Sequence, residues 1–174
     1  MITWATAKFA LATTILAWAV VEDLRTRKFK NRSFLIALAA GFSLIVVHSV
    51  FTQSGSPFIT GIAAASTALV FFFPLVQFKI VGAGDLKLMT AIGLCSEWNA
   101  ILETSVIALL WAAIFGVIQI IARKDLKGLA TNLLSLTLHK SADGLTLNRI
   151  PLTVPLLLGW LTQWTLARSG QGLW

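Results

Sequence analysis

Residues 33–78 contain no Asp, Glu, Lys or Arg; they read SFLIALAAGFSLIVVHSVFTQSGSPFITGIAAASTALVFFFPLVQF. This run is too long for one membrane helix, because ~20 apolar residues already span ~30 Å of hydrocarbon. Its middle is the polar, turn-forming segment Thr52-Gln53-Ser54-Gly55-Ser56-Pro57, which is typical of a tight loop. The run therefore predicts a hairpin of two membrane-spanning helices, over residues 33–51 and 57–78.

The whole chain has the composition of an integral membrane protein. Of its 174 residues, 57% are hydrophobic and 12% are charged, whereas a soluble domain has roughly 45–50% apolar and about 25% charged residues. The mean hydropathy is +0.83. This composition excludes a soluble enzyme and a disordered tail, and it excludes a nucleic-acid module despite the pI of about 10.2. The single cysteine, Cys95, allows neither an internal disulfide nor a Cys-rich zinc site.

Four further apolar segments complete a predicted all-α bundle of six transmembrane helices. They cover residues 2–21, 86–96, 100–122 and 150–167. The second of them is short, and ~10–14 apolar residues need not cross a membrane. Whether this segment crosses must therefore be judged from the distribution of charged residues. With all six crossings counted, the sequence predicts one membrane domain over residues 1–174.

The basic residues fall on one side of the membrane when six crossings are counted. Of the 14 Lys and Arg residues, all except Lys8 and Arg168 lie in or next to the predicted loops 22–32, 79–85 and 123–149. Basic loops face the cytoplasm, so both termini are predicted to lie outside it. If the short segment did not cross, the last loop would move to the outer side and the asymmetry would disappear.

The longest predicted loop has an amphipathic pattern. Apolar residues recur at helical spacing over residues 126–134, with Lys124 and Lys127 nearby. The pattern predicts a helix that either lies in the cytoplasmic headgroup layer or packs against the bundle. We also expect the basic loops to contact anionic lipid headgroups.

Only seven residues are acidic, and three of them lie where an apolar span meets the cytoplasm. These three are Glu22, Asp23 and Asp85. Asp23 follows one crossing and Asp85 follows three, so both are predicted at the same face of the bundle. Carboxylates at a membrane boundary are costly to ionise and are usually paired or functional. Two that face each other share a proton, which is the arrangement that aspartic proteolysis needs.

The other four acids are predicted on the outer side or in the long basic loop. They are Glu97, Glu103, Asp125 and Asp143.

Asp85 lies in the segment Val81-Gly82-Ala83-Gly84-Asp85-Leu86-Lys87. The two glycines remove side-chain bulk and allow unusual backbone angles, so an extended peptide substrate can approach the main chain there. The alternative is a turn in which Asp85 caps the start of the next helix. Spacing alone leaves both interpretations open.

Two segments of the chain resemble the type IV prepilin peptidases, which are membrane aspartic proteases with a GxGD motif. They are Asp23-Leu24-Arg25-Thr26-Arg27-Lys28-Phe29-Lys30-Asn31 and Gly82-Ala83-Gly84-Asp85-Leu86-Lys87-Leu88. Within that family the chain is most similar to the short form associated with tight-adherence (Flp) pili. The resemblance covers essentially the whole chain, in its length, its six predicted spans, its basic first cytoplasmic loop and the order of its aspartates.

The resemblance implies a catalytic pair and four supporting residues. Asp23 and Asp85 are the implied catalytic acids. The residues implied to bind substrate or to support the motif are Gly82, Gly84, Asn31 and Lys87. Glu22 is the alternative to Asp23; neighbouring residues on a helix point about 100° apart, so only one of them can face Asp85, and the resemblance favours Asp23.

The sequence departs from the family pattern in two places. Phe29-Lys30 stands where the family usually has an aliphatic residue and a proline before Asn31, so the start of the following helix is expected to differ. Leu152 replaces the tyrosine of an Ile-Pro-Tyr segment near the last span. Neither change removes an acid, so we expect both to affect substrate fit more than chemistry.

The implied function is removal of leader peptides from Flp-like prepilins at the cytoplasmic side of the bacterial inner membrane. Such a substrate has a basic leader, a glycine at the cut and then a hydrophobic helix. We expect no metal, no organic cofactor and no nucleic-acid partner. Two other functions stay open: a small cation-coupled transporter that binds cations at Asp23 and Asp85, and a non-catalytic membrane scaffold for pilus assembly. The transporter is disfavoured because no acid lies near the middle of a predicted span.

Overall fold

The computed structural model describes residues 3–26, 29–78, 80–123 and 152–170, and these form six helices and no strand. The helices are α1 (Trp4–Thr26), α2 (Asn31–Thr52), α3 (Ser56–Gln77), α4 (Ala83–Gly93), α5 (Trp98–Arg123) and α7 (Thr153–Arg168). The predicted all-α class is confirmed. The amphipathic segment predicted at 126–134 lies outside the described residues.

Four of these helices are long and apolar enough to cross a membrane. They are α1, α2, α3 and, over Trp98–Gln119, α5. The other two are shorter, with 11 residues in α4 and 16 in α7. At a rise of 1.5 Å per residue, α4 covers only ~16 Å, about half of the hydrocarbon thickness. The chain is thus a multi-pass helical membrane protein, and the part of it that the structure describes has four spans by length.

The predicted hairpin is formed by α2 and α3. Its turn begins at Gln53, which adopts a left-handed conformation with φ 48°. The Gln53 N–H donates to Val50 O (3.2 Å) and the Ser54 N–H donates to Ser49 O (3.2 Å). Pro57 stands in the first turn of α3, where its missing N–H costs no helix bond. The turn residues that interrupt the apolar run therefore mark the end of one helix and the start of the next.

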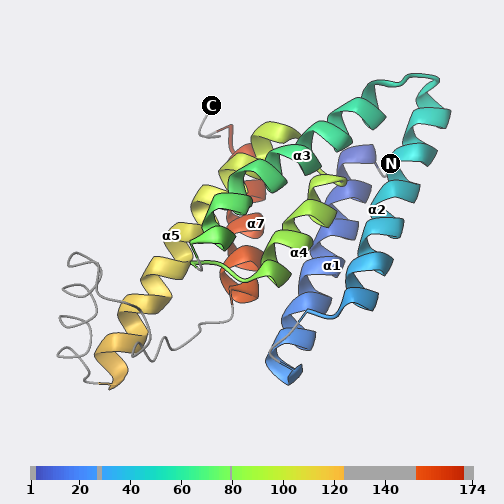
Figure 1. Ribbon diagram of the computed structural model, residues 1–174. Helices are drawn as coiled ribbons and strands as arrows, with labels where there is room; N and C mark the ends of the chain where they lie inside the picture. Colours follow the sequence, from blue (N-terminus) through green and yellow to red (C-terminus); the bar gives the residue numbers. More distant parts are fainter. Residues whose placement is uncertain (1–2, 27–28, 79, 124–151, 171–174) are drawn as a thin grey trace.

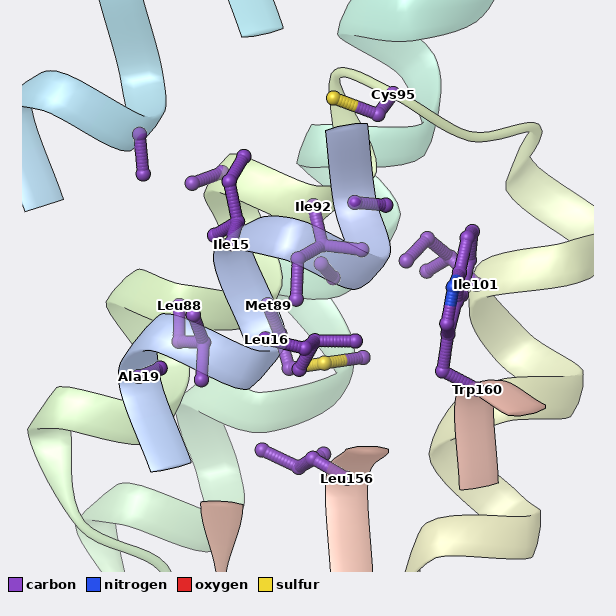
Figure 2. Packing of buried hydrophobic residues seen from close by; sticks show 14 of the residues in the cluster. Ile15, Leu16, Ala19, Leu88, Met89, Ile92, Cys95, Ile101, Leu156 and Trp160 are labelled. Atoms are coloured by element: carbon purple, nitrogen blue, oxygen red, sulfur yellow. The ribbon is translucent and has the colours of Figure 1, made fainter. Parts of the chain in front are cut away.

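The short helix α4 lies at the centre of the bundle. Its Leu88, Met89 and Ile92 are fully buried. Figure 2 shows Leu16 of α1 beside Met89, with Leu156 of α7 below them. α4 packs against α3, α2, α1 and α5, and these neighbours bury its apolar side chains although the helix itself is short.

Small residues allow the closest helix pairs. A Cβ on Gly93 of α4 would lie 2.6 Å from the Ala65 Cα of α3. A Cβ on Gly159 of α7 would lie 2.8 Å from the Ala108 N of α5. Real Cβ atoms do not approach so closely, so these glycines set the helix separations, as is common in membrane bundles.

Consecutive helices alternate in direction through the bundle (Figure 1). The end of α1, the start of α2, the start of α4 and the start of α7 therefore lie toward the same end of the molecule, while the first residues of α1 and the last residues of α7 lie toward the opposite end. Asp23, Asn31 and Asp85 therefore lie toward the same end of the bundle.

Candidate active site

Asp23 lies in the last turn of α1 and is half-buried. Its Oδ2 accepts a hydrogen bond of 2.8 Å from the hydroxyl of Thr153, the first residue of α7. Thr153 is 2% exposed, so this bond is sheltered from solvent. The contact fixes the Asp23 carboxylate against a helix that begins 130 residues later in the chain.

Asp85 is the third residue of α4, one turn after its N-cap residue Gly82. The Gly82 N–H donates to Asp85 Oδ2 (3.3 Å), and the Asp85 N–H donates to Gly82 O (3.1 Å). A carboxylate in the first turn is stabilised by the positive end of the helix dipole. The capping interpretation is therefore correct in kind, although Asp85 is not the N-cap residue itself.

The two aspartates interact electrostatically. Burial, and to a smaller extent the negative charge of Asp23, raise the pKa of Asp85 to about 7 against the opposing effect of the Gly82 N–H bond. Repulsion between two charges is stronger at a partly desolvated site than in bulk water, because the site has a lower effective dielectric. Asp23 and Asp85 are thus near enough to interact electrostatically although they are 62 residues apart in sequence (85 − 23).

Glu22 faces a different neighbour. It is 9% exposed, and its Oε1 lies 3.9 Å from the Lys30 amine. Its Oε2 is buried and has no hydrogen-bond partner among the described residues. Since Glu22 contacts the residue before α2 while Asp23 contacts α7, the two neighbouring acids are turned to different sides of α1.

Asn31 and Lys87 meet directly. The Lys87 amine donates to Asn31 Oδ1 at 2.8 Å. Asn31 is the first residue of α2, and Lys87 lies in the first half of α4. The bond joins the starts of these two helices on the same end of the bundle as the aspartates.

The two glycines of the motif make room for protein atoms. A Cβ on Gly82 would lie 3.1 Å from Asp85 Oδ2, and a Cβ on Gly84 would lie 3.3 Å from the Phe29 Cβ. In this conformation, therefore, the glycines allow the Asp85 carboxylate and Phe29 to approach the α4 backbone. Their predicted part in admitting a peptide backbone stays a prediction.

Both departures from the family pattern have structural partners here. Phe29 packs against the main core cluster, and Lys30 pairs with Glu22 before α2 begins at Asn31. Leu152 is the N-cap residue of α7 and also packs against the core. The segment before Asn31 is thus held by packing and an ion pair where a proline is usual.

Thr153 is the site residue that the sequence reasoning missed. By crossing parity the last helix enters from the same face as Asp23 and Asp85, so its first residues belong to the same end of the bundle. Among the acids, crossing parity singles out Glu22, Asp23 and Asp85, and Thr153 is not an acid. If the parity argument is extended to hydroxyl residues at the starts of helices that enter from this face, it includes Thr153.

The described residues contain no group of three or more His, Cys, Asp or Glu side chains that could hold a metal ion. The polar groups at this end of the bundle include two interacting carboxylates, one hydroxyl donor and one amine–amide bond. This set can exchange protons with a bound water and a peptide carbonyl.

A family model described as the type IV leader peptidase family matches residues 10–119. The match covers both aspartates, the GAGD segment and Asn31, and it ends before α7 begins. No curated protein and no solved structure matches the chain significantly.

Proposed function

Because the chain belongs to the type IV leader peptidase family, we propose that Asp23 and Asp85 are the two catalytic acids with which it cleaves Flp-like prepilins. Membership of the family makes the chain a membrane aspartic peptidase that removes the leader peptide from prepilins. We further propose which residues act, on which side of the membrane they act, and which kind of prepilin they cleave.

The observation that carries the proposal is the electrostatic interaction between the two aspartates. The pKa of Asp85, about 7, makes it the acid that holds a proton near neutral pH. Asp23 has a different environment, because it accepts a hydrogen bond from the Thr153 hydroxyl. A pair in which one carboxyl group is protonated and the other is ionised is the starting state of aspartic proteolysis.

Peptide hydrolysis then follows in two steps. In the first, Asp23 takes a proton from water, the hydroxide oxygen bonds to the scissile carbonyl carbon, and Asp85 gives its proton to the carbonyl oxygen. In the second, the gem-diol collapses: Asp23 passes its proton to the amide nitrogen, the C–N bond breaks, and Asp85 recovers a proton from a diol hydroxyl. The products are a free carboxyl group and a free amine, and both acids return to their starting states.

The site is proposed to work at the cytoplasmic boundary of the bacterial inner membrane. The basic residues Arg25, Lys30, Arg32 and Lys87 lie at the same end of the bundle as the two aspartates. Basic residues accumulate on the cytoplasmic side. A substrate whose leader is cytoplasmic and whose mature part begins with a membrane helix would present its cleavage bond at this depth.

The substrate class is proposed from the resemblance to the tight-adherence form. That resemblance rests on the Asp23 and GAGD segments and on their order in the chain. We therefore expect an Flp-like prepilin to be cleaved in preference to a prepilin of the longer type IV class.

A cleavage assay separates this function from a transporter and from a silent scaffold. An Flp-like prepilin is coexpressed with the wild type, Asp23→Asn or Asp85→Asn, and leader removal is followed by gel shift. Each substitution alone is expected to abolish processing at an unchanged protein level, because the remaining aspartate cannot act as both base and acid.

Glu103→Gln is the matched control. Glu103 is a buried acid of α5 whose Oε2 accepts a hydrogen bond from Gln163 (3.3 Å), and an amide can replace it in that bond. This variant is expected to process the prepilin normally. Continued cleavage by either aspartate variant would remove that aspartate from the mechanism.

A further inference from the structure

The start of α7 contributes a side chain to the proposed catalytic pair. Thr153 Oγ1 lies 2.8 Å from Asp23 Oδ2, and the hydroxyl is the donor because it points at a carboxylate oxygen. This is the one hydrogen bond to the Asp23 carboxylate from a side chain among the described residues. It joins the last turn of α1, which lies inside the segment that matches the family model, to the first turn of α7, which lies outside that segment.

The Thr153 hydroxyl is not used for its own helix. A threonine near a helix start usually accepts a hydrogen bond from an N–H of the first turn. Here the N-cap residue is Leu152, which has no side-chain capping bond, and the Thr153 hydroxyl is directed across to α1. The start of α7 thus has no side-chain cap, and the Thr153 hydroxyl donates to the Asp23 carboxylate instead.

The surroundings hold the hydroxyl in place. Thr153 is 2% exposed, and two residues of the same helix turn, Pro155 and Leu156, are also buried. A β-branched side chain has few χ1 rotamers, so a buried Thr153 offers its hydroxyl in one direction. The acceptor is thereby held as well, because rotating the Asp23 carboxylate would break a sheltered bond.

We propose that Thr153 is a positioning residue for Asp23: its hydroxyl holds Oδ2 and leaves Oδ1 as the oxygen that takes the proton from water. The inference rests on the proposed function, since it assigns Asp23 as the base. A carboxylate with one oxygen fixed presents the other in a defined orientation, and orientation of this kind contributes strongly to catalytic rates. The role acts through Asp23 and requires no contact between Thr153 and the substrate.

The test compares two substitutions of Thr153 in the purified full-length protein, reconstituted in lipid vesicles with a full-length Flp-like prepilin. Thr153→Val keeps the shape and removes the donor, and Thr153→Ser keeps the donor and removes a methyl group. A hydrogen bond to a charged group corresponds to a change of about tenfold to a hundredfold in rate. Thr153→Val is expected to lower kcat by that factor with KM changed by less than about twofold, whereas Thr153→Ser keeps kcat within about threefold of the wild type.

Thr162→Val is the matched control on the same helix. The Thr162 hydroxyl accepts a hydrogen bond from the Trp111 indole N–H (3.3 Å), so its loss also removes a tertiary contact of α7. This variant is expected to keep the wild-type kcat. If Thr153→Val does not accumulate, Thr153→Ala compared with Thr153→Ser decides the same question.

Three outcomes overturn the inference: full activity of Thr153→Val, equal impairment of the serine and valine variants, or a loss confined to KM. Failure of the proposed function gives a different result. If Asp23→Asn still cleaves the prepilin, then the catalytic assignment itself is wrong. If Asp23→Asn is inactive and Thr153→Val is fully active, only the role of Thr153 is wrong.

Discussion

The Asp85 carboxylate takes part in two interactions at once. One oxygen accepts the Gly82 N–H at the start of α4, and the group as a whole is repelled by Asp23. The capping contact favours the charged form and the repulsion favours the protonated form. Burial and repulsion prevail, and they place the pKa of Asp85 near neutrality, where it can act as an acid.

The raised pKa of Asp85 gives a prediction about pH. The acid must be protonated to donate to the carbonyl oxygen, and its pKa is about 7, so kcat/KM is expected to fall as the pH rises through about 7. Above that value the decline approaches tenfold per pH unit. The profile is measured from pH 6 to 9 with the vesicle assay, and the folded fraction is followed by circular dichroism. A rate that stays constant to pH 9 would contradict the role of Asp85 as the acid.

Gly82→Ala is expected to reduce activity by displacing that carboxylate. The new Cβ would lie 3.1 Å from Asp85 Oδ2, so the carboxylate or the turn has to move by a few tenths of an ångström. Small displacements of catalytic groups cost up to about a hundredfold in rate, and we expect a loss of about tenfold in kcat. Gly55→Ala is the control, because a Cβ there would meet nothing within 4 Å. Equal activities of the two variants would show that the tight contact at Gly82 is without consequence.

Glu22→Gln is expected to leave cleavage close to the wild-type rate. Glu22 contacts Lys30, whose side chain is 61% exposed, over 3.9 Å, and an ion pair of this kind contributes about 1 kcal/mol or less to stability. Leader removal is compared with that by Asp23→Asn in the same cells. An inactive Glu22→Gln together with an active Asp23→Asn would exchange the roles of the two neighbouring acids.

At the scale of the helices, the sequence predicted which helices exist and in what order they follow, but it predicted their first and last residues less well. The hairpin of α2 and α3 was predictable because an uncharged run was interrupted by turn residues. α1 continues to Thr26, beyond the apolar segment that ends at residue 21. α4 starts at Ala83 and so includes Asp85. The first charged residue indicates where the hydrocarbon layer ends. A helix, however, ends where its backbone hydrogen bonds end. Both aspartates therefore lie on helices that extend past the apolar segments.

The site was predictable only in part for a related reason. Crossing parity places residues at one face of the membrane, and this reduced the seven acids to Glu22, Asp23 and Asp85; the resemblance to the family then favoured Asp23 over Glu22. It does not give the direction in which a side chain points. The Asn31–Lys87 bond and the Thr153–Asp23 bond depend on how helices are rotated against each other, and that rotation is set by packing such as the approach of Gly159 to Ala108.

Gly159→Ala is expected to destabilise the contact between α5 and α7. An added Cβ would lie 2.8 Å from the Ala108 backbone N, and overpacking of this kind costs about 1–3 kcal/mol, more than the ~1 kcal/mol that alanine gains over glycine in helix propensity. Thermal unfolding in detergent is expected to occur at a lower temperature than for the wild type. An unchanged or higher midpoint would mean that the two helices can separate without cost.

On the scale of the whole molecule, four helices are long enough to span a membrane and two are shorter. The central position of α4 explains how an 11-residue helix is retained in the bundle. Its exposed starting end and buried far end mean that Asp85 lies near the surface while Leu88, Met89 and Ile92 fill the core. The orientation of this molecule in the membrane is a prediction from the basic residues.

Cysteine labelling tests that orientation. Ser54 in the α2–α3 turn and Ala83 at the start of α4 are exposed, whereas the native Cys95 is 1% exposed and should stay silent. In intact cells, a membrane-impermeant maleimide is expected to label Ser54→Cys from outside and to label Ala83→Cys only after permeabilisation. The reverse pattern would place the aspartates outside the cytoplasm.

The Thr153–Asp23 bond joins an early part of the chain to a late one, and this has a consequence for how the enzyme matures during its synthesis. When α1 to α5 have entered the membrane, the nascent chain already carries both aspartates, but the hydroxyl that holds one of them has not yet been translated. On the proposed role of Thr153, efficient catalysis begins only once α7 has docked against α1 and α5. The protease would thus become active only after its last helix is inserted, which separates the synthesis of both aspartates in time from the onset of activity.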